Sequence, residues 1–201
     1  MTTSLRCWPS LKRGPKTSIN ALTSLDRPFE EAEILRAINQ LPQDKAPGTD
    51  GYTDLFFRTC WPIIKLDVIA AINAFYDLRS ADFNLLNKAN IVLIPKLEGA
   101  EDIRRPISLI NAMAKIISKI LALRLAPFLN ALISPCQSAF IRGRSIHDNY
   151  MYVRNVARRF HRNRTQALLF KLVISKAFDT VRWDYLLSLM QHRGFPTRWR
   201  N

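Results

Sequence analysis

The chain has 201 residues, 48% of them hydrophobic and 10% aromatic, and a formal net charge of +14. This composition is typical of a globular protein and excludes a disordered polar chain. No apolar run approaches the ~18 residues that a membrane helix needs, and the first residues lack the apolar stretch of a signal peptide. The three cysteines are too far apart for a zinc site or a disulfide framework. We therefore expect an intracellular protein, in the nucleus or the cytoplasm, with no membrane partner.

The excess positive charge is concentrated in the second half of the chain. Residues 91–201 hold 19 Lys or Arg and 6 Asp or Glu, whereas residues 1–90 hold 11 and 10. A strongly basic region suits a polyanionic partner, so this pattern favours RNA or DNA binding. A solvated basic surface is the alternative explanation.

The first half is expected to be helical after a flexible start. Residues 1–27 are basic and interrupted by prolines and a glycine, which predicts a flexible lead-in. Phe29–Leu41 has an apolar stripe at helical spacing, with acidic residues in its first turns. Asp44–Tyr52 is a turn-rich loop, and Asp54–Tyr76 is a second helical stretch that we expect Pro62 to start or break.

The middle of the chain predicts a hairpin and a long helix. Ala89–Pro95 is a short β-branched run, which indicates a strand, and the polar residues Lys96–Asp102 suit a hairpin tip. Ser108–Ala126 has apolar residues at helical spacing and ends before Pro127. We expect this helix to anchor the core, with Ile117 and Leu121 on one face, flanked by Met113 and Ile120.

The last third alternates helix, strand and helix. Ser145 opens a helix with Arg154, Arg158, Arg159 and Arg162 on the face opposite its apolar stripe. Ala167–Ile174 predicts a strand, and Trp183–His192 predicts a helix that Gly194 closes. Together these elements predict an α+β fold that is rich in helices and has a few short strands.

Five sequence blocks resemble reverse transcriptases of non-LTR (LINE-type) retrotransposons, and they occur in that family's order. They are D-K-A-P-G-T-D-G-Y, I-V-L-I-P-K, R-P-I-S-L, Q-S-A-F-I-R-G-R-S-I-H-D-N and K-L-V-I-S-K-A-F-D-T-V, the last followed by W-D-Y-L and R-G-F-P. The resemblance implies that residues 28–201 form the fingers and an incomplete palm of a right-hand polymerase. The ancestral reaction it implies is RNA-directed DNA synthesis.

The resemblance also assigns roles to single residues. The first Asp of the palm block, which holds catalytic magnesium in the family, is replaced by Val173, and the family's second Asp pair would lie beyond Asn201. Lys96 and Arg105 occupy positions that hold the nucleotide triphosphate, although the hairpin tip is shorter than usual. Phe178 occupies the position of the aromatic beneath the incoming sugar. Two exposed hairpin cations and a core phenylalanine are the plain alternatives.

Two basic clusters are candidates for contact with the nucleic-acid backbone. Arg142 and Arg144 flank Gly143 just before a helix, where free amides and guanidinium groups converge. The second cluster is Arg158, Arg159 and Arg162. A simple start to the helix and a solvated face are the alternatives.

These residues predict a degenerate, truncated reverse transcriptase that we expect to be catalytically inactive. We expect no bound metal or other cofactor, although the family uses magnesium, and weak, sequence-independent binding of RNA or DNA. The alternatives are a non-catalytic nucleic-acid-binding module and a relic without function.

Overall fold

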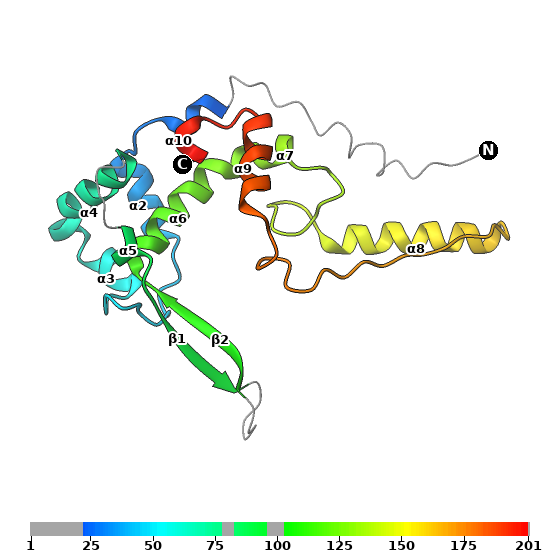
Figure 1. Ribbon diagram of the computed structural model, residues 1–201, viewed down its shortest axis with the longest axis horizontal. Coiled ribbons are helices and arrows are strands. Elements are labelled where there is room, and N and C mark those ends of the chain that lie inside the picture. The colour runs from blue at the N-terminus through cyan, green and yellow to red at the C-terminus, as the bar shows by residue number, and fades with distance from the viewer. Residues whose placement is uncertain (1–21, 78–82, 96–102, 201) are drawn as a thin grey trace. The chain divides into compact units, whose positions relative to one another are not determined.

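The computed structural model describes residues 22–77, 83–95 and 103–200 (Figure 1). These residues form two compact units. One is Arg27–Arg124, and the other combines residues 22–26 with residues 125–200. The predicted boundary between residues 27 and 28 stays a prediction. Among the described residues, every helix is too short or too polar to cross a membrane.

Four helices precede the hairpin in the unit Arg27–Arg124: α2 (Glu31–Asn39), α3 (Asp54–Thr59), α4 (Trp61–Tyr76) and α5 (Phe83–Leu86). Helix α3 begins where the Thr53 hydroxyl accepts a hydrogen bond from the Phe56 N–H. Pro62 lies in the first turn of α4, where its missing N–H costs little. The expected break at Pro62 is therefore confirmed.

The predicted hairpin is confirmed as the antiparallel pair β1 (Ala89–Pro95) and β2 (Ile103–Ile110), which extends away from the helices of its unit (Figure 1). The register shifts between Ile94 and Pro95, which leaves a bulge beside the tip. Lys96 and the rest of the predicted tip lie outside the described residues.

Helix α6 (Ala112–Leu125) supplies much of the core of this unit. It begins later than the predicted Ser108, because residues up to Ile110 pair with β1. Its most deeply buried side chains are Ile116 and Ile120, whereas Leu121 is only partly buried. The expected core positions Ile117 and Ile120 are therefore confirmed as buried, whereas the expected burial of Leu121 is wrong. The other core residues are Ile34, Ala37, Ile38, Phe57, Trp61, Val68, Ile72, Ala112 and Ile117.

The second unit has a small core of its own. The 3₁₀ turn η2 (Thr23–Asp26) brings Leu25 against Leu132 of α7 (Leu129–Leu132), and Leu22 joins them. The turn η3 (Ala126–Phe128) and helix α10 (Thr197–Arg200) flank this cluster. The sequence assigned Leu22 and Leu25 to a segment with little structure, so their burial is a correction.

The remaining helices of this unit match their predictions. Helix α8 (Ile146–Arg162) begins at Ser145, whose hydroxyl accepts from the His147 N–H. Helix α9 (Trp183–His192) ends at Gly194, which has a φ of +81°, and the Phe195 N–H donates to the Met190 carbonyl. This pattern is a Schellman motif, so the expected glycine cap is confirmed.

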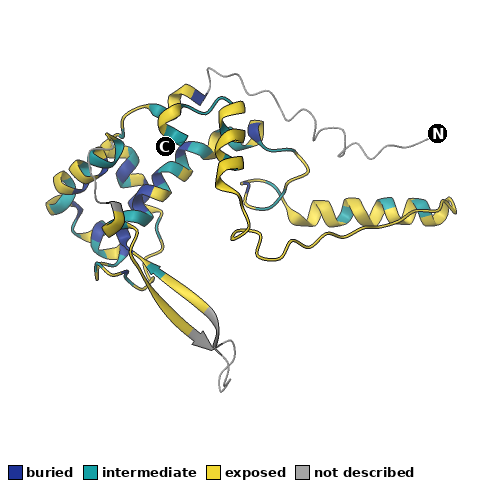
Figure 2. Cartoon of the chain, in the orientation of Figure 1, coloured by how far each residue is buried: buried dark blue, intermediate teal, exposed yellow. Residues whose placement is uncertain are grey.

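The predicted strand Ala167–Ile174 does not form. The described residues contain one sheet, in which β1 and β2 pair only with each other, so this segment has no neighbouring strand. A strand needs a partner for its backbone N–H and C=O groups. The segment instead returns along the apolar side of α8, where the two enclose a groove of about 330 Å³. Most of its side chains remain exposed (Figure 2).

Candidate nucleic-acid interface

The loop between α7 and α8 is held in place by Arg144. All five guanidinium N–H groups of an arginine can donate, and Arg144 makes five hydrogen bonds of 2.6 to 3.3 Å within its own unit. The acceptors are the Asn130 side chain, which accepts twice, and the carbonyls of Ile133, Ser134 and Gln137. In this conformation Arg144 shapes the loop and has no N–H left for a phosphate.

Arg142 differs from Arg144 in its surroundings. Arg142 is exposed and is followed by Gly143, whose φ of +82° turns the chain into α8. Asn149, on the first turn of α8, donates to the Cys136 carbonyl and to the Ser138 hydroxyl. The loop is thus tied down at both ends, and Arg142 remains available at its surface.

Helix α8 presents a basic face. Arg154, Arg158 and Arg162 are spaced by four residues, which places them on one side of the helix. Arg158, Arg159 and Arg162 are exposed, and within the described part of the chain no ion pair engages any of them. Like charges four residues apart repel, so this face raises the free energy of the helix in the absence of an anionic partner.

The palm block lies in exposed irregular structure. The exposed fractions of Val173 and Phe178 are 78% and 86%. Magnesium prefers carboxylate and phosphate oxygens, and the Val173 side chain has none. Across the described ranges, no three His, Cys, Asp or Glu side chains are grouped to hold a metal ion. The residues at this position therefore do not fit the family's magnesium pair.

Two of the predicted nucleotide contacts, Arg105 and Phe178, belong to different compact units. Arg105 lies on β2 with its backbone opposite Ile94, and Lys96 is outside the described residues. Their role in binding the nucleotide therefore stays a prediction.

The D-K-A-P-G-T-D-G-Y loop docks on the start of α6. Asn111 accepts from the Thr49 hydroxyl at 2.7 Å, and the Asp50 carboxylate accepts from the Ala112 N–H at 2.8 Å. A Cβ on Gly48 would stand 2.4 Å from the Ile110 carbonyl carbon, so only glycine permits this approach. The loop therefore fixes the junction between β2 and α6.

Asp54 is the buried acid of this region. Its side chain has 2% exposure and its two carboxylate oxygens accept no hydrogen bond in the structure. Burial raises the pKa of Asp54, and the charge of Lys115, 3.9 Å away, opposes that rise. Lys115 also donates to the Ala46 carbonyl of the docked loop.

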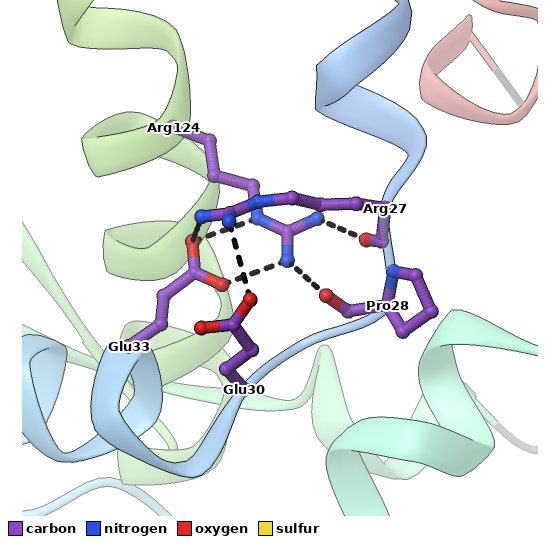
Figure 3. Close-up of polar contacts among 5 residues, drawn as sticks. All are labelled: Arg27, Pro28, Glu30, Glu33 and Arg124. Carbon is purple, nitrogen blue, oxygen red and sulfur yellow. Dashed lines mark hydrogen bonds and ion pairs between the residues drawn. The ribbon is translucent and has the colours of Figure 1, made fainter.

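Near the C-terminal end of α6, Arg124 contacts residues at the start of the same unit (Figure 3). Its Nε and Nη2 atoms each donate to Glu33 at 2.7 Å, and further bonds reach the carbonyls of Arg27 and Pro28. The guanidinium carbon also stands 4.1 Å from the centre of the Phe29 ring. Neither Arg124 nor Asp54 was predicted as a buried charge. Arg124 follows the buried Ile116 and Ile120 at intervals of four residues, and Asp54 precedes the buried Phe57 by three, so helical spacing places both charges on buried faces. Spacing does not show that Arg124 pairs with Glu33.

Comparison with known proteins identifies the family. Residues 94–201, more than half of the chain, match the family model of the reverse transcriptase (RNA-dependent DNA polymerase). The chain belongs to the reverse transcriptase family. A relative in Xenopus laevis, the "Transposon TX1 uncharacterized 149 kDa protein", is 30% identical over 183 residues, which are 90% of this chain and 14% of that protein. The expected membership among reverse transcriptases of non-LTR retrotransposons is confirmed.

The reverse transcriptase match covers all the basic residues of the candidate interface. Arg142, α8 and the palm block fall inside residues 94–201, and so does the backbone of β2. The loop that docks on α6 through Asp50 lies before the match. The alignment with the Xenopus laevis relative covers 90% of the chain and therefore includes this loop.

Proposed function

We propose that this chain is the fingers and first palm part of a right-hand polymerase, and that it binds nucleic acid without catalysing nucleotidyl transfer. Reverse transcriptases as a family bind nucleic acid. We further propose that binding by this chain is weak and independent of sequence, because arginine contacts to phosphates carry no base information.

The arginine face of α8 is the observation that carries this proposal. The arginine side chains on this face repel one another, which raises the free energy of the helix. No ion pair with a described acidic side chain offsets that repulsion. A phosphate backbone would remove that repulsion and release counterions. Arg142 adds a guanidinium close in sequence to the start of the same helix.

The lack of catalysis is proposed from the chemistry of position 173. Two metal ions stabilise the attacking and leaving oxygens in this class of reaction. The Val173 side chain cannot contribute an oxygen ligand, and it is exposed in a segment of irregular structure. Asp179 is the acid left in the palm block, and its backbone N–H donates to the Lys176 carbonyl within a turn.

A salt series tests the binding. Fluorescence anisotropy of a labelled single-stranded RNA should give a plot of log affinity against log salt with a slope of about −0.7 per phosphate contacted. The double variant Arg158→Gln/Arg162→Gln should flatten the slope by about 1.4. The matched control Arg36→Gln/Lys88→Gln removes the same charge from exposed positions outside α8, and its slope should equal that of the wild type. Absence of binding at low salt would leave a chain without function as the better explanation.

Primer extension tests the missing catalysis. With a template–primer and magnesium or manganese, we expect no incorporation by the wild type. Val173→Asp should also be inactive, because one carboxylate does not hold two metals. Extension above a control without protein would refute this part of the proposal and leave the binding part standing.

A further inference from the structure

Phe140 is the most exposed large hydrophobic side chain of the described residues. It lies in the loop between α7 and α8, and 92% of its surface is accessible to solvent. Its φ is +63°, in the left-handed region that a bulky residue rarely adopts. An aromatic ring held outward in an uncommon backbone conformation raises the question of what it contacts.

The loop around Phe140 is fixed by its neighbours. The next side chain, Ile141, is buried, and its carbonyl accepts from the Arg144 N–H at 3.2 Å. On the other side, the Gln137 carbonyl accepts from the Arg144 guanidinium at 2.7 Å, and the Ser138 hydroxyl accepts from Asn149 at 2.9 Å. The outward position of the ring is therefore set by hydrogen bonds two or three residues away.

The surroundings of Phe140 suit a nucleobase better than an apolar protein surface. Its sequence neighbours include the polar Gln137 and Ser138, and the exposed cation Arg142 follows two residues later. A single ring beside a cation is the arrangement by which proteins stack on bases of single strands while contacting the backbone. A docking site for an apolar partner would need a contiguous patch instead.

We propose that Phe140 stacks on a base of a single-stranded nucleic acid while Arg142 contacts the adjacent phosphate. This inference rests on the proposed nucleic-acid binding and adds a base contact to it. Every base has a π face, so the contact is tolerant of sequence, in agreement with binding that does not depend on sequence.

The test compares two strands of equal charge. An RNA oligonucleotide and an abasic strand with the same phosphates are titrated against the full chain by fluorescence anisotropy at one salt concentration. The wild type should bind the strand with bases about 10-fold more tightly, the expected loss for one stacking contact. Phe140→Ala should remove this preference and leave the affinity for the abasic strand unchanged. Phe140→Trp should keep the preference.

The controls separate this inference from the proposed function. Phe140→Ala keeps a Cβ at the same φ, and the ring it removes is exposed, so circular dichroism and thermal melting should match the wild type. Tyr185→Ala removes another exposed aromatic, on α9, and should keep the preference. If Phe140→Ala retains the preference, Phe140 does not stack and the binding proposal survives. If the wild type binds neither strand, both proposals fail.

Discussion

Replacing Arg124 with Met should destabilise the unit Arg27–Arg124 more than any exposed charge substitution. The side chain of Arg124 has 3% exposure and that of Glu33 has 12%. Met keeps the apolar stem but removes the four hydrogen bonds to Glu33, Arg27 and Pro28. The Glu33 carboxylate then stays largely buried, with Arg27 as its remaining ion-pair partner, 3.8 Å away.

The magnitude follows from what the substitution leaves behind. Removing one partner of a buried ion pair costs about 3–5 kcal/mol, because the other charge stays desolvated. Arg27 remains beside Glu33 and offsets part of that cost, so we expect about 3 kcal/mol. With a urea dependence of about 2 kcal/mol/M, the midpoint should fall by about 1.5 M. The stability of a small domain is about 5–15 kcal/mol, so this is a large share.

The assay is a urea melt followed by circular dichroism, with amide hydrogen exchange of α2 and α6 reporting on this unit separately from the other. Lys65→Met is the matched control, because the Lys65–Glu31 pair is 3.5 Å long, with side chains 42% and 51% exposed. It should cost less than about 1 kcal/mol.

The double variant Glu33→Met/Arg124→Met tests the cause of the loss. It removes both charges, so it should be more stable than Arg124→Met alone by at least about 1 kcal/mol. Two results would refute the reasoning. One is a loss for Arg124→Met no larger than that for Lys65→Met. The other is a double variant as unstable as the single one, which would mean that the buried Glu33 charge is not the source.

Two further predictions concern the core and the buried acid. Ile120→Ala should cost about 2–5 kcal/mol and Leu121→Ala clearly less, because Ile120 is fully buried and Leu121 only partly; urea melts that give equal losses would contradict this. Burial raises the folded-state pKa of Asp54 above its ordinary 3.8. The stability that its neutral form contributes is therefore complete below about pH 4 and is lost as pH rises through the folded-state pKa. The advantage of Asp54→Asn over the wild type should grow over that window in urea melts, and an advantage independent of pH would contradict it.

The elements that the sequence predicted are those with strong local signals. Thr53, Pro62, Ser145 and Gly194 each satisfy or remove a backbone group at a helix end, so short-range chemistry sets these boundaries. The hairpin β1–β2 was likewise predictable, because the β-branched run ends in the I-V-L-I-P-K block and the expected hairpin tip follows it. Local chemistry gave the positions of the helices but not which residues lie deepest between them, as Ile120 and Leu121 show.

The wrong or missing predictions concern features that depend on contacts between residues far apart in the sequence. Ala167–Ile174 has a strand's composition, yet a strand forms only beside another, and the described sheet has two members. The burial of Leu22 depends on Leu132, which lies more than a hundred residues further along the chain. The partner of Arg124 is Glu33, 91 residues away. Periodicity within a window carries no information about such pairs.

The arginines of the Q-S-A-F-I-R-G-R block show what a motif leaves open about a site. From the sequence alone, Arg142 and Arg144 are equivalent cations on either side of Gly143. The structure divides their roles, because Arg144 donates all its N–H groups to the loop and Arg142 is exposed. A loop that presents Phe140 and Arg142 outward needs an internal donor to hold its carbonyls, and lysine, with three donors on one atom, cannot replace that planar fork. The basic character of this block therefore supports the shape of the interface as much as its charge.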